Sequence, residues 1–239
     1  MSFQDKLLDS FIAFEQVVDL DNPIHTNRKN ALKRFESNGF PTKKDELWKY
    51  TSLKSIIQKD YSLSVKNNPN VGLKDIKRYS INDIDSYKIV FVDGVFNPFL
   101  SNTTHDGMDI CVLSAALSKS KYKKTINKYF NKIVPDDQSL ASLNTSYTQE
   151  GAYIYIPKSV LPEDPVQILH FSSGKNKPLW LQPRNIIIVE ENARVEIIER
   201  HQSLRAHDGV TNSLTEIYAE KNSFIYYYNL NYNNTYVLS

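Results

Sequence analysis

A repeat near the end of the sequence constrains the fold of this chain more than any other feature. The segment VEENARVEII at 189–198 aligns with AEKNSFIYYY thirty residues later, at 219–228, which matches Asn192 to Asn222. Each copy has two β-rich runs around a polar corner. Such a unit buries its apolar face only by stacking on a neighbouring unit. The repeat therefore predicts a β-solenoid.

The composition is that of a globular protein with one large domain or two small ones. The 239 residues are 41% hydrophobic and 23% charged, which is enough for a substantial core. A formal net charge of +2 gives no electrostatic reason to expect nucleic acid or an anionic membrane as partner. The glycines are too widely spaced for GxGxxG or GxxxxGK[ST], so a glycine-built phosphate loop is excluded.

Two further sequence features bear on the cellular compartment in which the protein is located. No apolar run approaches the roughly 18 residues of a membrane span, and the opening MSFQDKLLDS lacks the apolar core of a signal peptide. A single Cys excludes an internal disulfide framework. We therefore expect a cytoplasmic protein with no membrane partner.

Hydrophobic spacing divides the first part of the chain into two regions. Apolar residues three and four apart predict a helix over 3–18, and a second helix is expected to end at Asn38. Residues 1–60 are thus expected to form an N-terminal helical region. Residues 61–147 are expected to form a small α/β region, which contains a strand and a DG turn over 88–94.

The spacing changes after Gly151, where β-forming runs replace helical periods. Before this point the sequence predicts a strand at 108–114 and a helix at 115–132. Residues 148–239 are then expected to form the first part of a β-helix core. Because a β-rich run precedes Ser239 without a capping element, we expect a longer chain, a covering partner, or self-association through the open end.

Four residues of the N-terminal half are distinctive. Cys111 lies in a predicted strand, where a buried and inert thiol is much more frequent than a reactive one, and it is only a weak candidate for a sulfur-handling role. Trp48, Lys49 and Tyr50 lie at a predicted helix end. Aromatic residues there more often pack in a core or an interface than bind a ligand.

The segment after the first repeat copy holds the densest group of potential metal ligands. His201 and His207 flank QSLRA, beside Glu199 and Asp208. Their spacing matches no standard zinc or iron pattern. Solvated loop residues are therefore the favoured interpretation, and His201 and His207 remain weak candidates.

Acidic pairs on the repeat leave an enzymatic alternative open. Glu190 with Glu191, and Glu196 with Glu199, could act as general acid and base if they converged in one groove. This would make the chain a β-helical carbohydrate-active enzyme, a lyase or a glycosidase. A scaffold protein would instead need an extended sheet edge or a flat face that mates with a similar structure.

Four segments together resemble the SufD family of iron–sulfur cluster assembly proteins. They are FPTKKDELWKYTSL at 40–53, FVDGVFNPFLS at 91–101, LASLNTSYTQEGAYIYIPKSV at 140–160 and PRNIIIVEENARVEIIERHQSL at 183–204. The WKYT motif and the VEENA-x-VEIIE-x-H segment are each fairly specific, and the four segments follow the order of the family.

The spacing of the residues predicts a mixed α/β N-terminal region followed by a β-helix. The resemblance implies a helical N-terminal domain, a right-handed parallel β-helix core and a C-terminal helical domain. It also implies a function as a non-catalytic scaffold subunit of the SufBCD complex, which pairs with SufB-like and SufC-like subunits. A transient iron–sulfur cluster is implied for the full complex, and no cofactor for this chain alone.

The sequence departs from the family in length. By resemblance, the later β-helix, the C-terminal helical domain and the family's functional histidine lie beyond this truncated sequence. His170, His201 and His207 do not match the motif of that histidine, so its role is not transferred to them. We therefore expect that the chain alone neither binds the ATPase stably nor holds a cluster, and that it has no catalytic, cofactor-binding or metal-binding residues.

Overall fold

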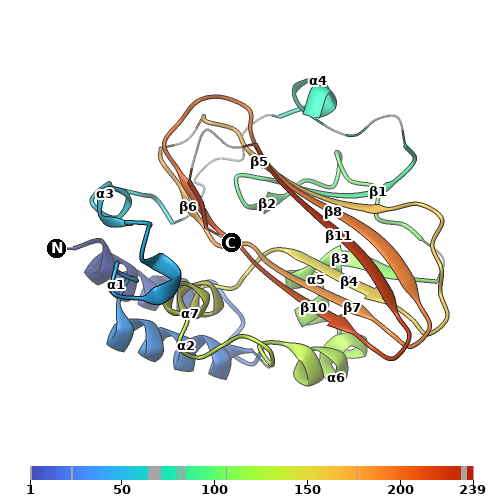
Figure 1. Ribbon diagram of the computed structural model, residues 1–239, viewed down its shortest axis with the longest axis horizontal. Helices are drawn as coiled ribbons and strands as arrows, with labels where there is room; N and C mark the ends of the chain where they lie inside the picture. The colour runs from blue at the N-terminus through green and yellow to red at the C-terminus, as the bar shows by residue number, and fades with distance from the viewer. Residues whose placement is uncertain are drawn as a thin grey trace.

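The computed structural model describes residues 2–22, 24–63, 71–79, 81, 84–105, 107–175, 177–232 and 236–238. Within these residues, three of the longer helices lie together beside a stack of β-strands (Figure 1). The α-helices are α1 (Phe3–Glu15), α2 (His25–Asn38), α3 (Lys54–Ile57), α4 (Leu73–Ile76), α5 (Leu113–Ser118), α6 (Ser120–Tyr129) and α7 (Ser139–Ser146). Two short 3₁₀ helices cover Glu46–Trp48 and Lys77–Tyr79.

The strands form three sheets. The five-stranded sheet has the order β11 (Phe224–Tyr232), β8 (Arg194–Ser203), β5 (Val166–Ser172), β1 (Tyr87–Val92), β2 (Val95–Phe96). The four-stranded sheet has the order β10 (Leu214–Ala219), β7 (Arg184–Val189), β4 (Ala152–Ile156), β3 (Asp109–Val112). The three-stranded sheet has the order β12 (Tyr236–Leu238), β9 (Val210–Asn212), β6 (Trp180–Leu181).

The thirty-residue repeat is confirmed by the strand register. In the parallel pair of β8 and β11, Val195 lies opposite Ile225, and in the pair of β7 and β10, Arg184 lies opposite Leu214. Both pairs are offset by thirty residues. Stacking of the two copies buries the inward side of β8, as the pattern predicted.

The prediction of a right-handed parallel β-helix is wrong, because the fold is mixed α/β with three sheets that mix parallel and antiparallel pairs. β1 pairs antiparallel with β2, and β3 pairs antiparallel with β4. β1 also pairs in parallel with β5, so a strand from residues 87–92 continues the sheet of the repeat. The repeat indicates only how neighbouring copies stack. It carries no information on which earlier strands join the same sheets.

The turn between β1 and β2 confirms the predicted hairpin. Asp93 and Gly94 both have positive φ, 50° and 80°, as a two-residue turn of this type requires. The helix predicted over 115–132 is in fact two helices, and α5 already begins at Leu113. Lys119 separates them because its backbone is extended, with φ −94° and ψ 124°.

The first two helices agree with their predicted positions. α1 begins at Phe3 as expected and ends at Glu15, three residues earlier than predicted. α2 ends at Asn38, and Gly39 follows with φ 66°. Its ψ of −163° lies outside the left-handed helical region, but the positive φ is a conformation that glycine adopts readily and that ends the helix here. No helix in the described ranges combines the length and apolar character needed to cross a bilayer.

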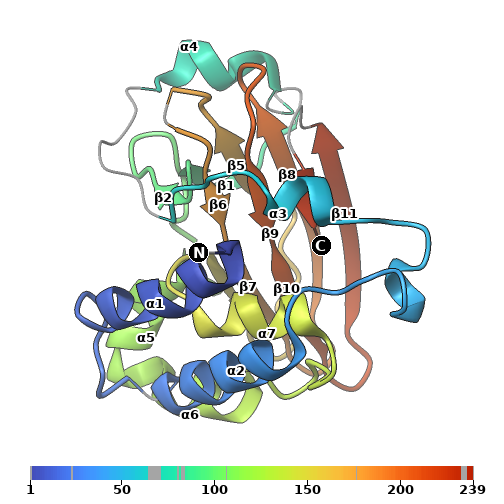
Figure 2. The ribbon, with the colours of Figure 1, turned by 90° about the vertical axis from the view of Figure 1, so that its left-hand side faces the viewer.

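Four apolar clusters lie among the described residues, and three of them join the sheets to one another and to the longer helices. Inward side chains of the five- and four-stranded sheets form a central cluster that includes Ile168, Ile187 and Val195. Helices α5 and α6 cover the outer side of the four-stranded sheet through a second cluster. Figure 2 shows α1, α2 and α7 below the strands, where a third cluster surrounds Trp180.

Candidate functional site

Three aromatic rings stack across neighbouring strands on the inward face of the five-stranded sheet. They belong to Phe91, His170 and His201. His170 on β5 and His201 on β8 are register partners, and parallel strands in register place such side chains directly next to each other. Their rings are nearly parallel, 11° apart, with centroids 4.6 Å apart. Phe91 on β1 stacks on the other side of His170 at 4.9 Å.

Glu199 completes the polar side of this stack. It lies two residues before His201, so both side chains point to the same face of β8. Its Oε1 atom lies 2.8 Å from Nε2 of His201 and 3.9 Å from Nε2 of His170. Its Oε2 atom accepts hydrogen bonds from the hydroxyls of Thr215, at 2.9 Å, and Tyr227, at 2.5 Å. Strands β8, β10 and β11 therefore all hold this carboxylate.

The three ligand-type side chains are buried. The exposed fraction is 0% for Glu199, 1% for His201 and 8% for His170. Burial raises the pKa of the Glu199 carboxyl, but hydrogen bonds and charge from the histidines and Tyr227 outweigh this and lower the pKa to about 2. Burial, and then the proximity of His201, lowers the pKa of His170 to about 3. Glu199 is thus ionised and His170 neutral at pH 7.

The residues suggested by the sequence are only partly brought together. His201 and Glu199 belong to the buried cluster. Asp208 instead accepts a hydrogen bond of 2.8 Å from the Lys59 ammonium group on the surface. Nδ1 of His207 lies 2.9 Å from the carbonyl oxygen of Arg205. Sequence reasoning did not place His170 beside His201. The two histidines are 31 residues apart, close to the repeat length of thirty, and this spacing is the one sequence feature that indicates their proximity.

The other distinctive residues lie far from this cluster. Cys111 on β3 pairs with Tyr153 on β4, and burial raises the pKa of its thiol to about 11. Trp48 packs against the cluster around α1, whereas Tyr50 is 91% exposed and lies under the Lys49 ammonium group at 5.6 Å. The structure thus separates the two aromatic side chains of the WKYT motif.

The acidic pairs that favoured a carbohydrate-active enzyme do not converge. Glu196 is exposed whereas Glu199 is buried, because the two side chains point to opposite faces of β8. Glu191 pairs with Lys158 at 2.7 Å on the surface, and Glu190 accepts from the backbone N–H of Lys158. The described residues therefore offer these pairs no common groove, and the enzymatic alternative is not supported.

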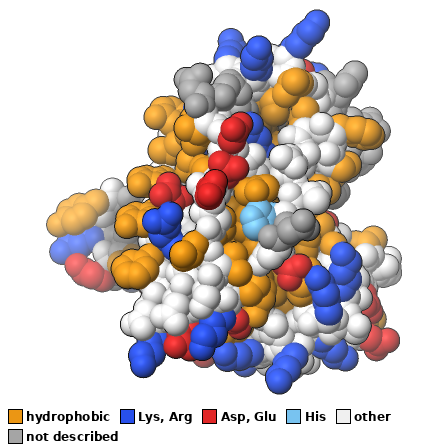
Figure 3. Space-filling view, turned by 90° about the vertical axis from the view of Figure 1, so that its right-hand side faces the viewer, with side chains coloured by type: hydrophobic (Ala, Val, Ile, Leu, Met, Phe, Trp, Pro, Cys, Tyr) orange, Lys and Arg blue, Asp and Glu red, His pale blue; other side chains and the backbone are white. Residues whose placement is uncertain are grey.

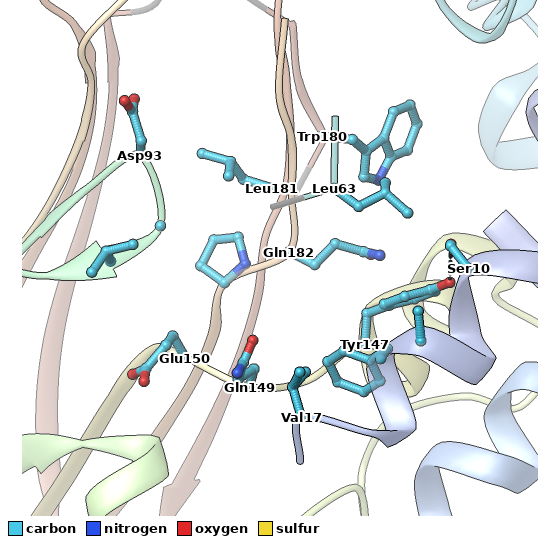
Figure 4. Close-up of a pocket in the computed structure, with 15 residues that line it drawn as sticks. Ser10, Val17, Leu63, Asp93, Tyr147, Gln149, Glu150, Trp180, Leu181 and Gln182 are labelled. Atoms are coloured by element: carbon cyan, nitrogen blue, oxygen red, sulfur yellow. Dashed lines mark hydrogen bonds between the residues drawn. The ribbon is translucent and has the colours of Figure 1, made fainter. Parts of the chain in front are cut away.

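A separate pocket of about 530 Å³ lies between α1, the β1–β2 turn and β6. In Figure 4, Asp93 and Glu150 lie on one side of it, and Ser10 and Tyr147 lie on the other, joined by a hydrogen bond of 2.8 Å. Oε2 of Glu150 has no hydrogen-bond partner among the described residues, and burial raises the pKa of this carboxyl.

The outer face of β11 is rich in exposed aromatic side chains. Phe224, Tyr226 and Tyr228 alternate along the strand and therefore share one face. Within the described ranges, β11 pairs on one side only, with β8. On the side of the molecule that is at the right in Figure 1, acidic, basic and hydrophobic side chains are interspersed (Figure 3). The β11 region thus combines an open sheet edge with an aromatic surface.

Comparison with known proteins places this chain among the proteins of iron–sulfur cluster assembly. Residues 1–168 match the model of the SufBD protein N-terminal region, and residues 170–239 match the SufBD core domain of the SUF system for FeS cluster assembly. The chain belongs to the SufBD family. The resemblance seen in the sequence is therefore confirmed.

The relatives are longer than this chain. A SufBD family protein of Synechocystis sp. is 24% identical over 184 residues, which cover 77% of this chain and 40% of that protein. The assembly protein SufD of Escherichia coli is 26% identical over 178 residues, 72% of this chain and 38% of that protein. SufD of Bacillus subtilis is 27% identical over 119 residues, 48% of this chain and 26% of that protein. The chain thus spans two fifths or less of these relatives.

Proposed function

We propose that this chain is a non-catalytic scaffold subunit in iron–sulfur cluster assembly, which pairs with SufB-like and SufC-like subunits in the cytoplasm. The observation that carries the proposal is the match of two consecutive SufBD family models to residues 1–168 and 170–239. Two of the relatives are themselves named iron–sulfur cluster assembly protein SufD. The cluster is then a transient product of the whole complex.

The surface of β11 supports a scaffold role. A strand with unpaired backbone groups can add to the sheet of another protein, and exposed aromatic side chains supply contact area at a low cost in conformational entropy. β11 has both features, because within the described residues it pairs only with β8, and its Tyr226 and Tyr228 side chains are exposed.

Co-expression tests this proposal. The complete natural reading frame that contains this chain is tagged and expressed with the SufB and SufC homologues of the same organism. We expect the three subunits to purify together, and the reconstituted complex to contain iron and acid-labile sulfide. The tagged subunit alone should hydrolyse no ATP. Purification without either homologue, or ATP hydrolysis by this subunit alone, would contradict the proposal.

A matched pair of variants examines the β11 surface. Tyr226→Lys introduces a charge on the aromatic face and should reduce the amount of SufB homologue recovered. Lys124→Ala removes an exposed charge from α6 and should leave recovery unchanged. Equal recovery with both variants would show that another face contacts the partner.

A further inference from the structure

The interior cluster of His170, Glu199 and His201 has the composition of a metal site. One ligand atom from each residue, two imidazole nitrogens and one carboxylate oxygen, lies within 4.8 Å of the other two. Two histidines and a carboxylate are a recurrent ligand set for Zn²⁺ and Fe²⁺ in proteins, and they leave further coordination positions open. We propose that this cluster binds one divalent first-row transition-metal ion of this class.

An unpartnered atom points to a ligand independently of this composition. Nε2 of His170 is buried and has no hydrogen-bond partner among the described residues. Such an atom is costly in a protein interior unless a bound species satisfies it. It lies 3.9 Å from Oε1 of Glu199, too far for a hydrogen bond. An ion between the two side chains would satisfy this nitrogen and neutralise a buried carboxylate.

Metal binding requires a limited rearrangement of these side chains. Two ligand atoms at about 2.1 Å from one tetrahedral ion are about 3.4 Å apart, and all separations in the cluster are within 4.8 Å, so none has to shrink by more than about 1.4 Å. The two stacked imidazole rings also have to turn toward a common point, because the lone pair of each nitrogen lies in its ring plane. The contacts of Glu199 with the histidines, 2.8 Å and 3.9 Å, lie on either side of the tetrahedral separation.

Side chains around the cluster hold Glu199 as metal sites usually hold their ligands. Its second oxygen accepts from Thr215 and Tyr227, which leaves Oε1 directed at the two histidines. Thr215 in turn accepts a hydrogen bond from the side-chain amide of Asn185 at 3.0 Å. Such outer hydrogen bonds orient ligands and strengthen metal binding.

Polar side chains lie next to the cluster on the neighbouring strand. On β11, Asn229 lies opposite Glu199 and Asn231 lies opposite His201, and both asparagines are exposed. They share the inward face of β11 with Tyr227, because side chains alternate along a strand. The buried ligands therefore have polar rather than apolar side chains beside them toward the edge of the sheet.

The inference goes beyond the proposed scaffold function, and it is tested on the purified protein without its partners. Metal-free protein is titrated anaerobically with Co²⁺, and the absorption bands of bound Co²⁺ are followed. Zn²⁺ and Fe²⁺ are then added in separate experiments to displace Co²⁺. We expect one Co²⁺ per chain and displacement by stoichiometric Zn²⁺, whereas Fe²⁺, which binds such sites more weakly than Co²⁺, should compete only in excess. A wild-type protein without saturable Co²⁺ binding would overturn the proposal.

Two variants separate this site from other histidines. His170→Phe keeps an aromatic ring in the stack between Phe91 and His201 but removes the nitrogen, and should weaken Co²⁺ binding at least tenfold. The control variant, His207→Phe, changes a surface histidine and should bind as wild type does. Circular dichroism confirms that both variants fold. Unchanged binding by folded His170→Phe would overturn the proposal.

A spectroscopic measurement on the wild type makes the test independent of any variant. X-ray absorption of the Zn²⁺-loaded protein should show only nitrogen and oxygen neighbours at about 2.0–2.2 Å, with the signature of imidazole rings. A sulfur neighbour at about 2.3 Å would assign the ion to Cys111 and overturn the proposal.

Discussion

Strands β8 and β11 are two copies of one repeat, yet their surroundings differ completely. β8 lies between β5 and β11, and its inward residues are almost fully buried, with Val195 1% exposed. β11 has a neighbour on one side only, and its register partner for Val195, Ile225, is partly buried. The comparison shows that the repeat pattern decides which side chains point inward. The number of neighbouring strands decides how far they are buried.

The largest expected effect comes from a charge at the inner position. Val195→Asp places an unpaired carboxylate in the central apolar cluster, so we expect a loss of more than about 4 kcal/mol of unfolding free energy, or no folded protein. Circular dichroism and urea unfolding measure this. Ile225→Asp, the same change at the equivalent position of β11, should cost clearly less. Equal losses would show that β11 is buried as deeply as β8.

The second prediction compares a buried ion pair with an exposed one. Arg184 on β7 is 0% exposed and pairs with Glu216 on β10 at 2.5 Å. Burial lowers the pKa of the Arg184 guanidinium, and the charge of Glu216 opposes this shift. Glu216→Ala leaves Arg184 buried without its counter-charge, which should cost about 3–5 kcal/mol.

The control for this prediction is the pair of Lys158 and Glu191, which lies on the surface at 2.7 Å. Glu191→Ala should cost less than about 1 kcal/mol, because solvent screens an exposed pair. Urea unfolding of both variants checks the difference. Similar losses in the two variants would mean that water reaches Arg184 between β7 and β10.

The sequence predicted those features that depend on local pattern. Inward residues such as Val195, the end of α2 at Asn38 and the turn at Asp93 and Gly94 follow from residue type and short spacing, and all three agree with the structure. The pairing of β1 with β5 did not follow, because their partners are about 80 residues apart and share no repeat. This pairing, together with the antiparallel β1–β2 and β3–β4 pairs, is why the predicted β-helix was wrong.

The buried cluster shows the same limit. Glu199 and His201 were noticed because they are close in sequence. His170 joins them only through the register of β5 with β8, which fixes a spacing of 31 residues rather than 30. The extra residue lies in the segment that connects β5 with β8. The sequence repeat does not include β5, so it does not predict how β5 and β8 align. A metal set of three ligands was therefore not recognisable before the strands were aligned.

The third prediction concerns the hydrogen bond between Tyr227 on β11 and the buried Glu199 on β8. Tyr227→Phe removes the hydrogen bond from its hydroxyl to Glu199 but keeps the ring. Because the acceptor is a buried carboxylate, we expect a loss of about 1.5–3 kcal/mol in metal-free protein at pH 7. Tyr226→Phe, at the neighbouring outward position, should lose almost nothing. Thermal unfolding compares the two, and an unaffected Tyr227→Phe would show that Thr215 and His201 satisfy Glu199 alone.

The smallest effect on stability is expected on the outer face of β11, where self-association should respond instead. Tyr228 is 51% exposed, so Tyr228→Lys should change the unfolding free energy by no more than about 0.5 kcal/mol. A lysine on an edge strand opposes pairing of that edge with another chain. If the open edge of β11 mediates self-association, sedimentation at increasing concentration should show less of it in Tyr228→Lys than in wild type. Lys124→Ala on α6 should behave as wild type. Equal self-association of all three proteins would assign it to another surface, and the inner and outer copies of the repeat would then differ in burial alone.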